Sequence, residues 1–219
     1  MDINQKITEE LGVKLWQVEA AVKLIDEGNT IPFISRYRKE ATGSLNDEVL
    51  RNLHERLTYL RGLEDKKNQV LGSIEEQGKL TEELKTQILA AETLVAVDDL
   101  YRPYRPKRRT RATIAKEKGL DGLADVIRLQ LTKKPLEEEA VAYLSEEKGV
   151  LTTADAIAGA GDILAEAISD EADYRAYIRK ATLDEGQLLS EAKDEKAQTV
   201  YEMYYHYEEP VKKAAGHRI

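Results

Sequence analysis

Hydrophobic residues recur every three or four positions along most of the chain, and this spacing predicts a protein built almost entirely of helices. No stretch has the sustained alternation of apolar and polar residues that is typical of a half-buried strand. Only five prolines interrupt the pattern. The predicted fold class is therefore all-α, an irregular multi-helix array with a helix-turn-helix-like pair at its N-terminus and one long central helix.

The N-terminal pair is predicted from two apolar stripes that are separated at Gly12. The first stripe ends at Leu11 and the second begins at Leu15, a spacing that is similar to a helix-turn-helix. A DNA-reading helix presents basic and amide groups, whereas Glu19 and the neighbouring acids of this second helix repel phosphate. A packing role is therefore favoured over DNA reading, with Trp16 as a core or interface anchor.

The long central helix is predicted to run from Asn46, its N-cap, to Glu76. Its leucines follow a 3-4-3 spacing in the first half, after which Glu64 and Lys67 occupy the seam positions. A bend near Gly62 would allow the apolar stripe to shift at this point. A continuous helix of this length would extend over about 45 Å.

The later helices are expected to be shorter, with glycines between them. They are predicted over residues 135–144, 152–157 and 162–183, with a last helix through 200–207. Between two of them, residues 158–161 (AGAG) lack the lysine of a phosphate-binding loop and are interpreted as a tight helix–helix joint.

The chain is predicted to have five segments, bounded by helix breaks and by one change in composition. They are the helix-turn-helix-like N-terminal helices (1–45), the long helix and the helices that follow it (46–100), a basic proline-containing strap (101–111), a C-terminal helical array (112–209) and a lead-out segment (210–219). The third segment, called the basic strap from here on, is the most distinctive.

Positive charge is concentrated in the basic strap and the residues that follow it. Residues 101–118 contain eight basic residues and one acid, whereas the whole chain has a net charge of −8. Pro103 and Pro106 remove backbone donors and push Arg102 and Arg105 toward extended conformations. We therefore expect a stiff, extended strap whose arginines point in several directions.

Arginine that alternates with tyrosine is typical of surfaces that bind single-stranded nucleic acid by phosphate pairing and base stacking. In the structural alternative, the arginines pair with Asp98, Asp99 or acids of neighbouring helices, and the tyrosines pack at helix boundaries. The candidate phosphate-binding residues are Arg102, Arg105, Lys107, Arg108, Arg109 and Arg111, with Arg36, Arg38 and Lys39 as a second patch. The candidate stacking residues are Tyr101 and Tyr104.

The sequence offers no catalytic or metal-binding constellation. It has no cysteine and three histidines, and His54, His206 and His217 do not have the spacing of a zinc site. We therefore expect no enzymatic activity, no metal and no cofactor. The N-terminus lacks the pattern of a signal peptide, and no apolar run approaches the roughly 18 residues that a membrane span requires, so a cytoplasmic protein without membrane contact is expected.

Four blocks of sequence carry a family resemblance. They are residues 30–43 (TIPFISRYRKEATG), 57–60 (LTYL), 76–81 (EQGKLT) and 99–112 (DLYRPYRPKRRTRA). Together, and in this order, they resemble the N-terminal region of the Tex family of bacterial transcription accessory proteins. The resemblance extends over essentially all 219 residues.

The resemblance implies a helical scaffold within a nucleic-acid-binding protein rather than an enzyme. Members of the family continue into a YqgF domain, helix-hairpin-helix motifs and an S1 domain, so a fragment is expected, with these downstream domains as partners. The other expected partners are RNA or DNA, bound weakly and without sequence preference, and the transcription machinery. The alternative is a protein-interaction or domain-docking module that does not itself bind nucleic acid.

Overall fold

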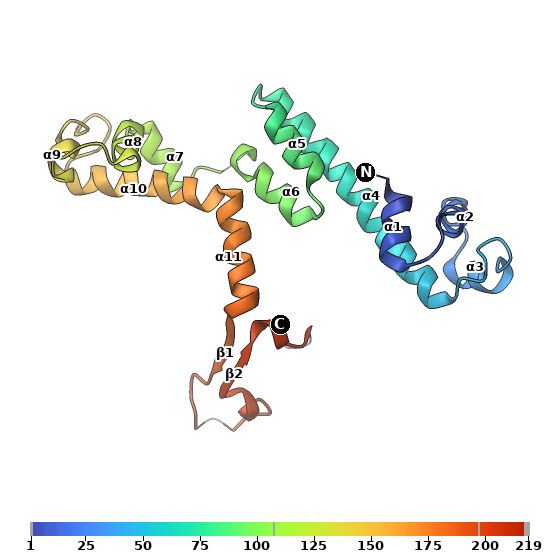
Figure 1. Cartoon of the computed structure of the whole chain (residues 1–219). Helices are drawn as coiled ribbons and strands as arrows, with labels where there is room; N and C mark the ends of the chain where they lie inside the picture. Colours follow the sequence, from blue (N-terminus) through green and yellow to red (C-terminus); the bar gives the residue numbers. More distant parts are fainter. Residues whose placement is uncertain (1, 107, 197, 217–219) are drawn as a thin grey trace. The chain divides into compact units, whose positions relative to one another are not determined.

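The computed structural model describes residues 2–106, 108–196 and 198–216. The chain forms two compact units, Met1–Asp98 and Asp99–Ile219. Within the described residues there are eleven α-helices and one antiparallel sheet of two short strands (Figure 1). The prediction of a mostly helical array with one long helix is confirmed.

The first unit is organised along one long helix. Its elements are α1 (Ile3–Leu11), α2 (Leu15–Asp26), α3 (Ile31–Tyr37), α4 (Asp47–Glu76), α5 (Glu82–Ala90) and the first part of α6 (Leu94–Tyr101). The helices α1, α2 and α3 pack against α4, and so does α5 (Figure 1). The leucines of the predicted seam, Leu50, Leu53, Leu57 and Leu60, are buried there.

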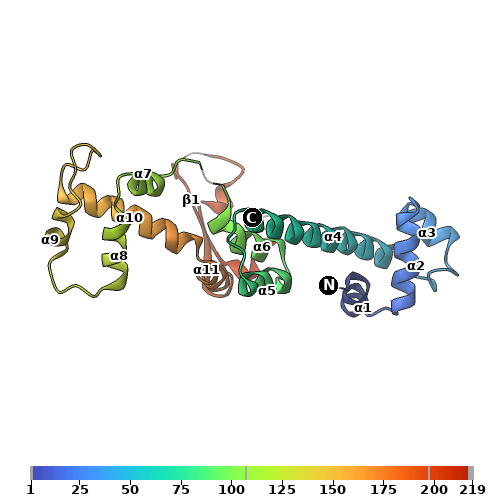
Figure 2. The same ribbon diagram turned by 90° about the horizontal axis from the view of Figure 1, so that it is seen from above.

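Local sequence signals set the ends of these helices. The side chain of Asn46 accepts a hydrogen bond from the backbone N–H of Val49 at 2.8 Å, as expected of the N-cap of α4. Gly12 ends α1 in the left-handed conformation that glycine adopts most readily, with φ 64°. The helix α4 continues without interruption through Gly62 to Glu76 (Figure 2).

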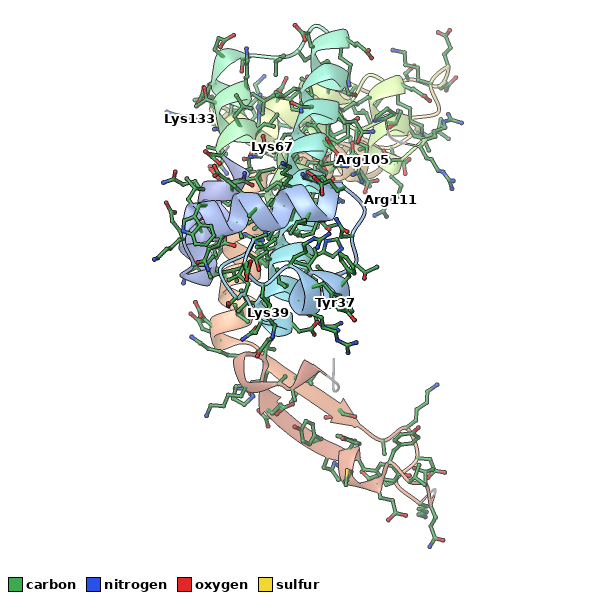
Figure 3. The ribbon with its side chains drawn as sticks, turned by 90° about the vertical axis from the view of Figure 1, so that its right-hand side faces the viewer. Tyr37, Lys39, Lys67, Arg105, Arg111 and Lys133 are labelled. Carbon is green, nitrogen blue, oxygen red and sulfur yellow. The ribbon has the colours of Figure 1, made fainter. Side chains whose placement is uncertain are left out.

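Lys67 accounts for the interruption of the leucine seam in α4. Its side chain is only 2% exposed, and its Nζ donates to the backbone carbonyl of Leu89 in α5 at 2.9 Å. The same Nζ forms an ion pair with Glu64 at 3.0 Å. The last carbonyls of a helix have no partner within the helix, so the ammonium group caps the C-terminal end of α5. Lys67 lies between α4 and α5 (Figure 3).

The second unit is organised along α10 (Thr153–Asp170). Its other helices are α7 (Arg111–Glu117), α8 (Asp121–Leu129), α9 (Leu136–Val141) and α11 (Ala172–Glu185), with short 3-10 turns at η1 (Arg102–Tyr104), η2 (Glu202–Tyr204) and η3 (Val211–Lys213). The helices α7, α8 and α9 pack on α10 (Figures 1 and 2). Small and branched side chains, among them Ala115, Leu120 and Ala160, form the core between these helices.

The helix predicted over residues 200–207 is wrong. This region contains the turn η2 and the start of strand β2 (His206–Pro210), which pairs antiparallel with β1 (Gln187–Glu191). Each strand has only five residues, too few to produce a clear alternation in the sequence. Their pairing joins segments that are distant along the chain, and no local pattern encodes it.

The predicted break at residues 158–161 is also wrong, because α10 continues through both glycines and the chain turns at Glu171 instead. Gly159 instead packs closely against Leu120, the residue before α8. A Cβ atom placed on Gly159 would lie 2.4 Å from Cδ1 of Leu120. Gly159 therefore lies inside one continuous helix, where its lack of a side chain permits the close contact with Leu120. It does not mark a joint between two helices.

Alanine substitutions at the two glycines of α10 are expected to have opposite effects on stability. Gly159→Ala pushes a methyl group into the buried Leu120 and should cost about 1–3 kcal/mol of stability. Gly161→Ala meets nothing within 4 Å and should stabilise the helix by up to about 1 kcal/mol. Hydrogen exchange of the α10 amides measures both changes. Equal effects of the two substitutions would contradict the packing role of Gly159.

Candidate nucleic-acid interface

The basic strap is extended in only part of its length. Arg102 lies in η1, where the N–H of Arg105 donates to its carbonyl at 3.4 Å, so the prediction of an extended Arg102 is wrong. A 3-10 turn accommodates Pro103 near its start, where a missing N–H removes no internal bond. Arg105 is extended, as predicted, with φ −65° and ψ 131°. The non-helical part of the strap ends at Thr110, whose hydroxyl caps α7 by accepting from the N–H of Thr113 at 3.0 Å, so Arg111 already belongs to that helix.

Three arginines of the basic strap are engaged in ion pairs. The pairs are Arg102 with Asp170 at 2.9 Å, Arg109 with Glu117 at 2.7 Å and Arg111 with Asp162 at 3.5 Å. Two of the three acids belong to α10, and the side chain of Asp170 is only 11% exposed. The pairs with Asp162 and Asp170 hold the strap on α10, and all three pairs balance the charge of a candidate cation.

The remaining strap candidates differ in their surroundings. The guanidinium of Arg105 lies 5.7 Å from the ring centre of Tyr101, so a cation already faces this tyrosine. Tyr101 and Tyr104 are both partly buried. Arg108 is exposed and has no ion pair or hydrogen bond with any residue that the structure describes. Lys107 lies outside the described residues.

An open hollow of about 560 Å³ lies between the basic strap and α10. Its lining carries charges of both signs, with Arg102, Arg105, Arg108 and Arg111 from the strap and α7 and Asp162, Glu166 and Asp170 from α10. Arg105 and Arg111 are seen in Figure 3. The acids weaken the attraction of this hollow for a phosphate chain.

The second predicted patch lies at the end of α3, in the first unit. We call Arg36, Arg38 and Lys39 the α3 patch. All three are exposed, and none forms an ion pair with a carboxylate among the described residues. The guanidinium of Arg38 lies 5.1 Å from the ring centre of Phe33. The ring carries no net charge, so it is not a counter-ion for the arginine.

The turn that carries the α3 patch is held by several hydrogen bonds. The side-chain amide of Gln17 in α2 donates to the carbonyls of Thr42 and Gly43 at 3.2 and 3.1 Å. Thr42 is fully buried, and its hydroxyl donates to the carbonyl of Arg38 at 3.2 Å. Trp16 packs against Gly43, where an added Cβ would lie 2.5 Å from the indole. The cations therefore stand on a preorganised turn.

Arginines elsewhere in the first unit are paired with acids. Arg56 makes two hydrogen bonds to Glu10, and Arg61 makes two to Asp26. The hydrogen bonds from these arginines lower the pKa values of the Glu10 and Asp26 carboxyls against the opposing effect of burial. The α3 patch thus differs from its neighbours in having three adjacent cations without such partners.

Asp99 has a role that the sequence did not reveal. Its side chain, 8% exposed, accepts hydrogen bonds from Arg175 at 2.6 Å and from Arg179 at 2.5 Å, both from α11. The sequence interpretation offered Asp99 as a partner for the strap arginines. The four-residue spacing of Arg175 and Arg179, which places them on one helix face, is the signal that was overlooked.

Two further properties concern metals and membranes. No group of three or more histidine, cysteine or acidic residues among the described residues is arranged to hold a metal ion. None of the described helices is long and apolar enough to cross a membrane.

Comparison with known proteins identifies relatives that match most or all of the chain. Residues 1–75 match the family described as "Tex-like protein N-terminal domain", and residues 131–219 match "Tex central region-like". The chain is 44% identical over 221–223 residues to "Transcriptional accessory protein Tex" of Neisseria gonorrhoeae and to an uncharacterised protein of Neisseria meningitidis. It is 31% identical over 180 residues to the human "S1 RNA-binding domain-containing protein 1".

These relatives are much longer than the chain. The matches with the two Neisseria proteins include 100% of the chain and 29% of each relative, and the match with the human protein includes 81% of the chain and 18% of that protein. The α3 patch lies within the first matched family region, whereas the basic strap lies between the two regions.

Proposed function

Because this chain belongs to the Tex family, we propose that it is the helical scaffold module of a Tex-like transcription accessory protein. In this proposal the module also contributes a basic surface that contacts RNA or DNA without regard to sequence. The names of two relatives, one a transcriptional accessory protein and one an S1 RNA-binding domain protein, support a role beside nucleic acid. The role would place the module in the cytoplasm, and we propose no enzymatic activity for it.

The observation that carries the proposal is the charge of the α3 patch. Its cations have no carboxylate partner among the residues described, so phosphate groups can bind them without breaking an ion pair. Arg102, Arg109 and Arg111 of the basic strap would first have to leave their acids. We therefore assign the main phosphate contacts to the α3 patch and a supporting contact to Arg108.

This assignment predicts which cations the affinity depends on. Reversal of the patch, R36E/R38E/K39E, should reduce binding to single-stranded RNA and to duplex DNA by at least tenfold, because three phosphate contacts become repulsive. Fluorescence-anisotropy titration at low salt measures the change. The matched control is K79E/K133E/K134E, which changes the net charge equally at three exposed lysines.

The control variant should lose much less affinity than the patch variant. Equal losses would mean that only net charge matters, and the surface would have no defined site. A third variant, R105E/R108E/R109E, tests the basic strap in the same assay. If this variant alone loses binding, the contact belongs to the strap and the assignment to the α3 patch is wrong.

A docking module is the second candidate function, and α11 favours it. This helix has no buried residue. It exposes Tyr177 by 73% and Ile178 by 61%, on a helix that packs with few neighbours. Exposed aromatic and aliphatic side chains on a helix are typical of surfaces that another protein covers. Failure of the wild-type chain to bind RNA or DNA in the titration would favour this function.

A further inference from the structure

Tyr37 stands in the middle of the α3 patch, and packing does not explain the position of its side chain. It is 67% exposed, although it is the last residue of an ordered helix. The cations Arg36, Arg38 and Lys39 surround it in the sequence. Tyr37 and Lys39 both extend from the end of α3 and the turn that follows it (Figure 3).

The ring of Tyr37 is supported from within its own helix. Its centre lies 5.3 Å from that of Phe33, with an angle of 43° between the ring planes. Phe33 is in turn faced by the guanidinium of Arg38 at 5.1 Å. These contacts restrain the orientation of Tyr37 while most of its surface stays open to solvent.

We propose that Tyr37 and the α3 patch form a binding site for single-stranded nucleic acid. An unpaired base stacks on the ring of Tyr37 while the phosphates on either side pair with Arg36, Arg38 and Lys39. The inference rests on the proposed function, which it deepens by naming the class of ligand. It also adds a stacking contact that Tyr101 and Tyr104, both partly buried, supply less readily.

The preference for single strands follows from the chemistry of stacking. In a duplex both faces of each base are covered by neighbouring bases, so an exposed protein ring gains a stacking partner only if a base leaves the helix. In a single strand the bases are already open, and stacking on an aromatic side chain does not depend on sequence. Cations alone would bind both forms through their phosphates.

The rigidity of the turn lowers the cost of binding. Gln17 fixes the backbone beside the patch by hydrogen bonds to the carbonyls of Thr42 and Gly43. The hydroxyl of Thr42 adds a hydrogen bond to the carbonyl of Arg38. Groups that are already ordered lose less conformational freedom when a ligand binds. A restrained ring beside restrained cations can therefore bind a flexible strand with a few contacts.

The test compares Tyr37→Ala with Tyr37→Phe in titrations against two probes, single-stranded oligothymidylate of about 12 nucleotides and a duplex of the same length. Tyr37→Ala should weaken binding to the single strand by about tenfold. Tyr37→Phe keeps the ring and should bind the single strand like the wild type. Duplex binding should be the same in all three proteins.

A control and a direct reporter are available in the same chain. Tyr201→Ala removes a ring that is 65% exposed in the second unit and should leave both affinities unchanged. Trp16 is the only tryptophan of the sequence and packs on Gly43 in the turn. Its fluorescence should change when the single strand binds, and the change should saturate at the same concentration as the anisotropy.

The outcomes separate this inference from the function on which it rests. If the wild type binds both probes and Tyr37→Ala binds the single strand as well as the wild type does, the stacking site is refuted while the basic surface stands. If Tyr37→Ala weakens binding to the duplex and to the single strand equally, the ring supports the turn and does not stack on a base. If the wild type binds neither probe, both proposals fail.

Discussion

Lys67→Ala is expected to destabilise the first unit by about 3 kcal/mol, the largest effect of any single substitution considered for this chain. The lysine stem is buried between α4 and α5, and loss of three methylene groups removes about 2 kcal/mol of burial. Its ammonium group also caps the carbonyl of Leu89, and loss of this charge-assisted bond adds about 1–2 kcal/mol. Urea unfolding followed by the fluorescence of Trp16 reports on this unit.

Two companion substitutions separate packing from capping. Lys67→Met keeps the volume of the stem and should lose only the polar part, about 1–2 kcal/mol. Lys85→Ala removes a lysine from α5 whose partner, Glu82, lies 4.0 Å away, and surface pairs of this kind contribute little. An alanine variant at Lys67 as stable as the Lys85 variant would show that Lys67 does not join the two helices.

Asp99→Asn should loosen α11 and cost about 2 kcal/mol, because two charge-assisted hydrogen bonds from Arg175 and Arg179 lose their anionic acceptor. Hydrogen exchange of the α11 amides should rise in the variant. Asp184→Asn, a substitution within α11 itself, is the matched control. Asp184 also pairs with two cations, Lys180 and Lys212, but at a more exposed position. Exchange in the control should change far less.

The contribution of Asp99 should also depend on pH. Burial acts to raise its pKa, but the hydrogen bonds and charges of Arg175 and Arg179 outweigh burial and lower the pKa below the ordinary value of 3.8. A carboxyl whose pKa is lowered on folding stabilises the folded state at pH values above its ordinary pKa. This stabilisation is lost as the pH falls toward the pKa of the folded state. The stability difference between wild type and Asp99→Asn should therefore be constant near neutral pH and shrink below about pH 4. A difference that grows with acid would contradict this sign.

Local sequence patterns were sufficient for the parts of the fold that are locally encoded. The cap at Asn46, the break at Gly12 and the leucine seam of α4 each depend on residues within one or two helical turns. The strands β1 and β2 depend on pairing across 14 intervening residues, from Glu191 to His206, and were missed. The close contact that Gly159 of α10 makes with Leu120 joins residues 39 positions apart, so it too lies beyond the reach of a local pattern.

The candidate site was only partly predictable for the same reason. Counting charges identified both the basic strap and the α3 patch, because composition is visible along the chain. Composition does not show which cations meet acids, and Asp162 and Asp170 of α10 approach the strap only in the folded structure. The open position of Tyr37 and the buried position of Asp99 are likewise products of tertiary packing.

The salt dependence of binding tests the central proposal most directly. Each phosphate contact with a single strand contributes about 0.7 to the slope of log affinity against log salt concentration, so the three contacts of the α3 patch account for about −2 of the slope. The neutral variant R36Q/R38Q/K39Q should bind more weakly and lose this part of the slope, while neutralising Arg105, Arg108 and Arg109 should remove only the supporting contact of Arg108, about 0.7 of slope. A wild type whose affinity ignores salt, or a patch variant that keeps the full slope, would contradict the assignment of the phosphate contacts to the α3 patch.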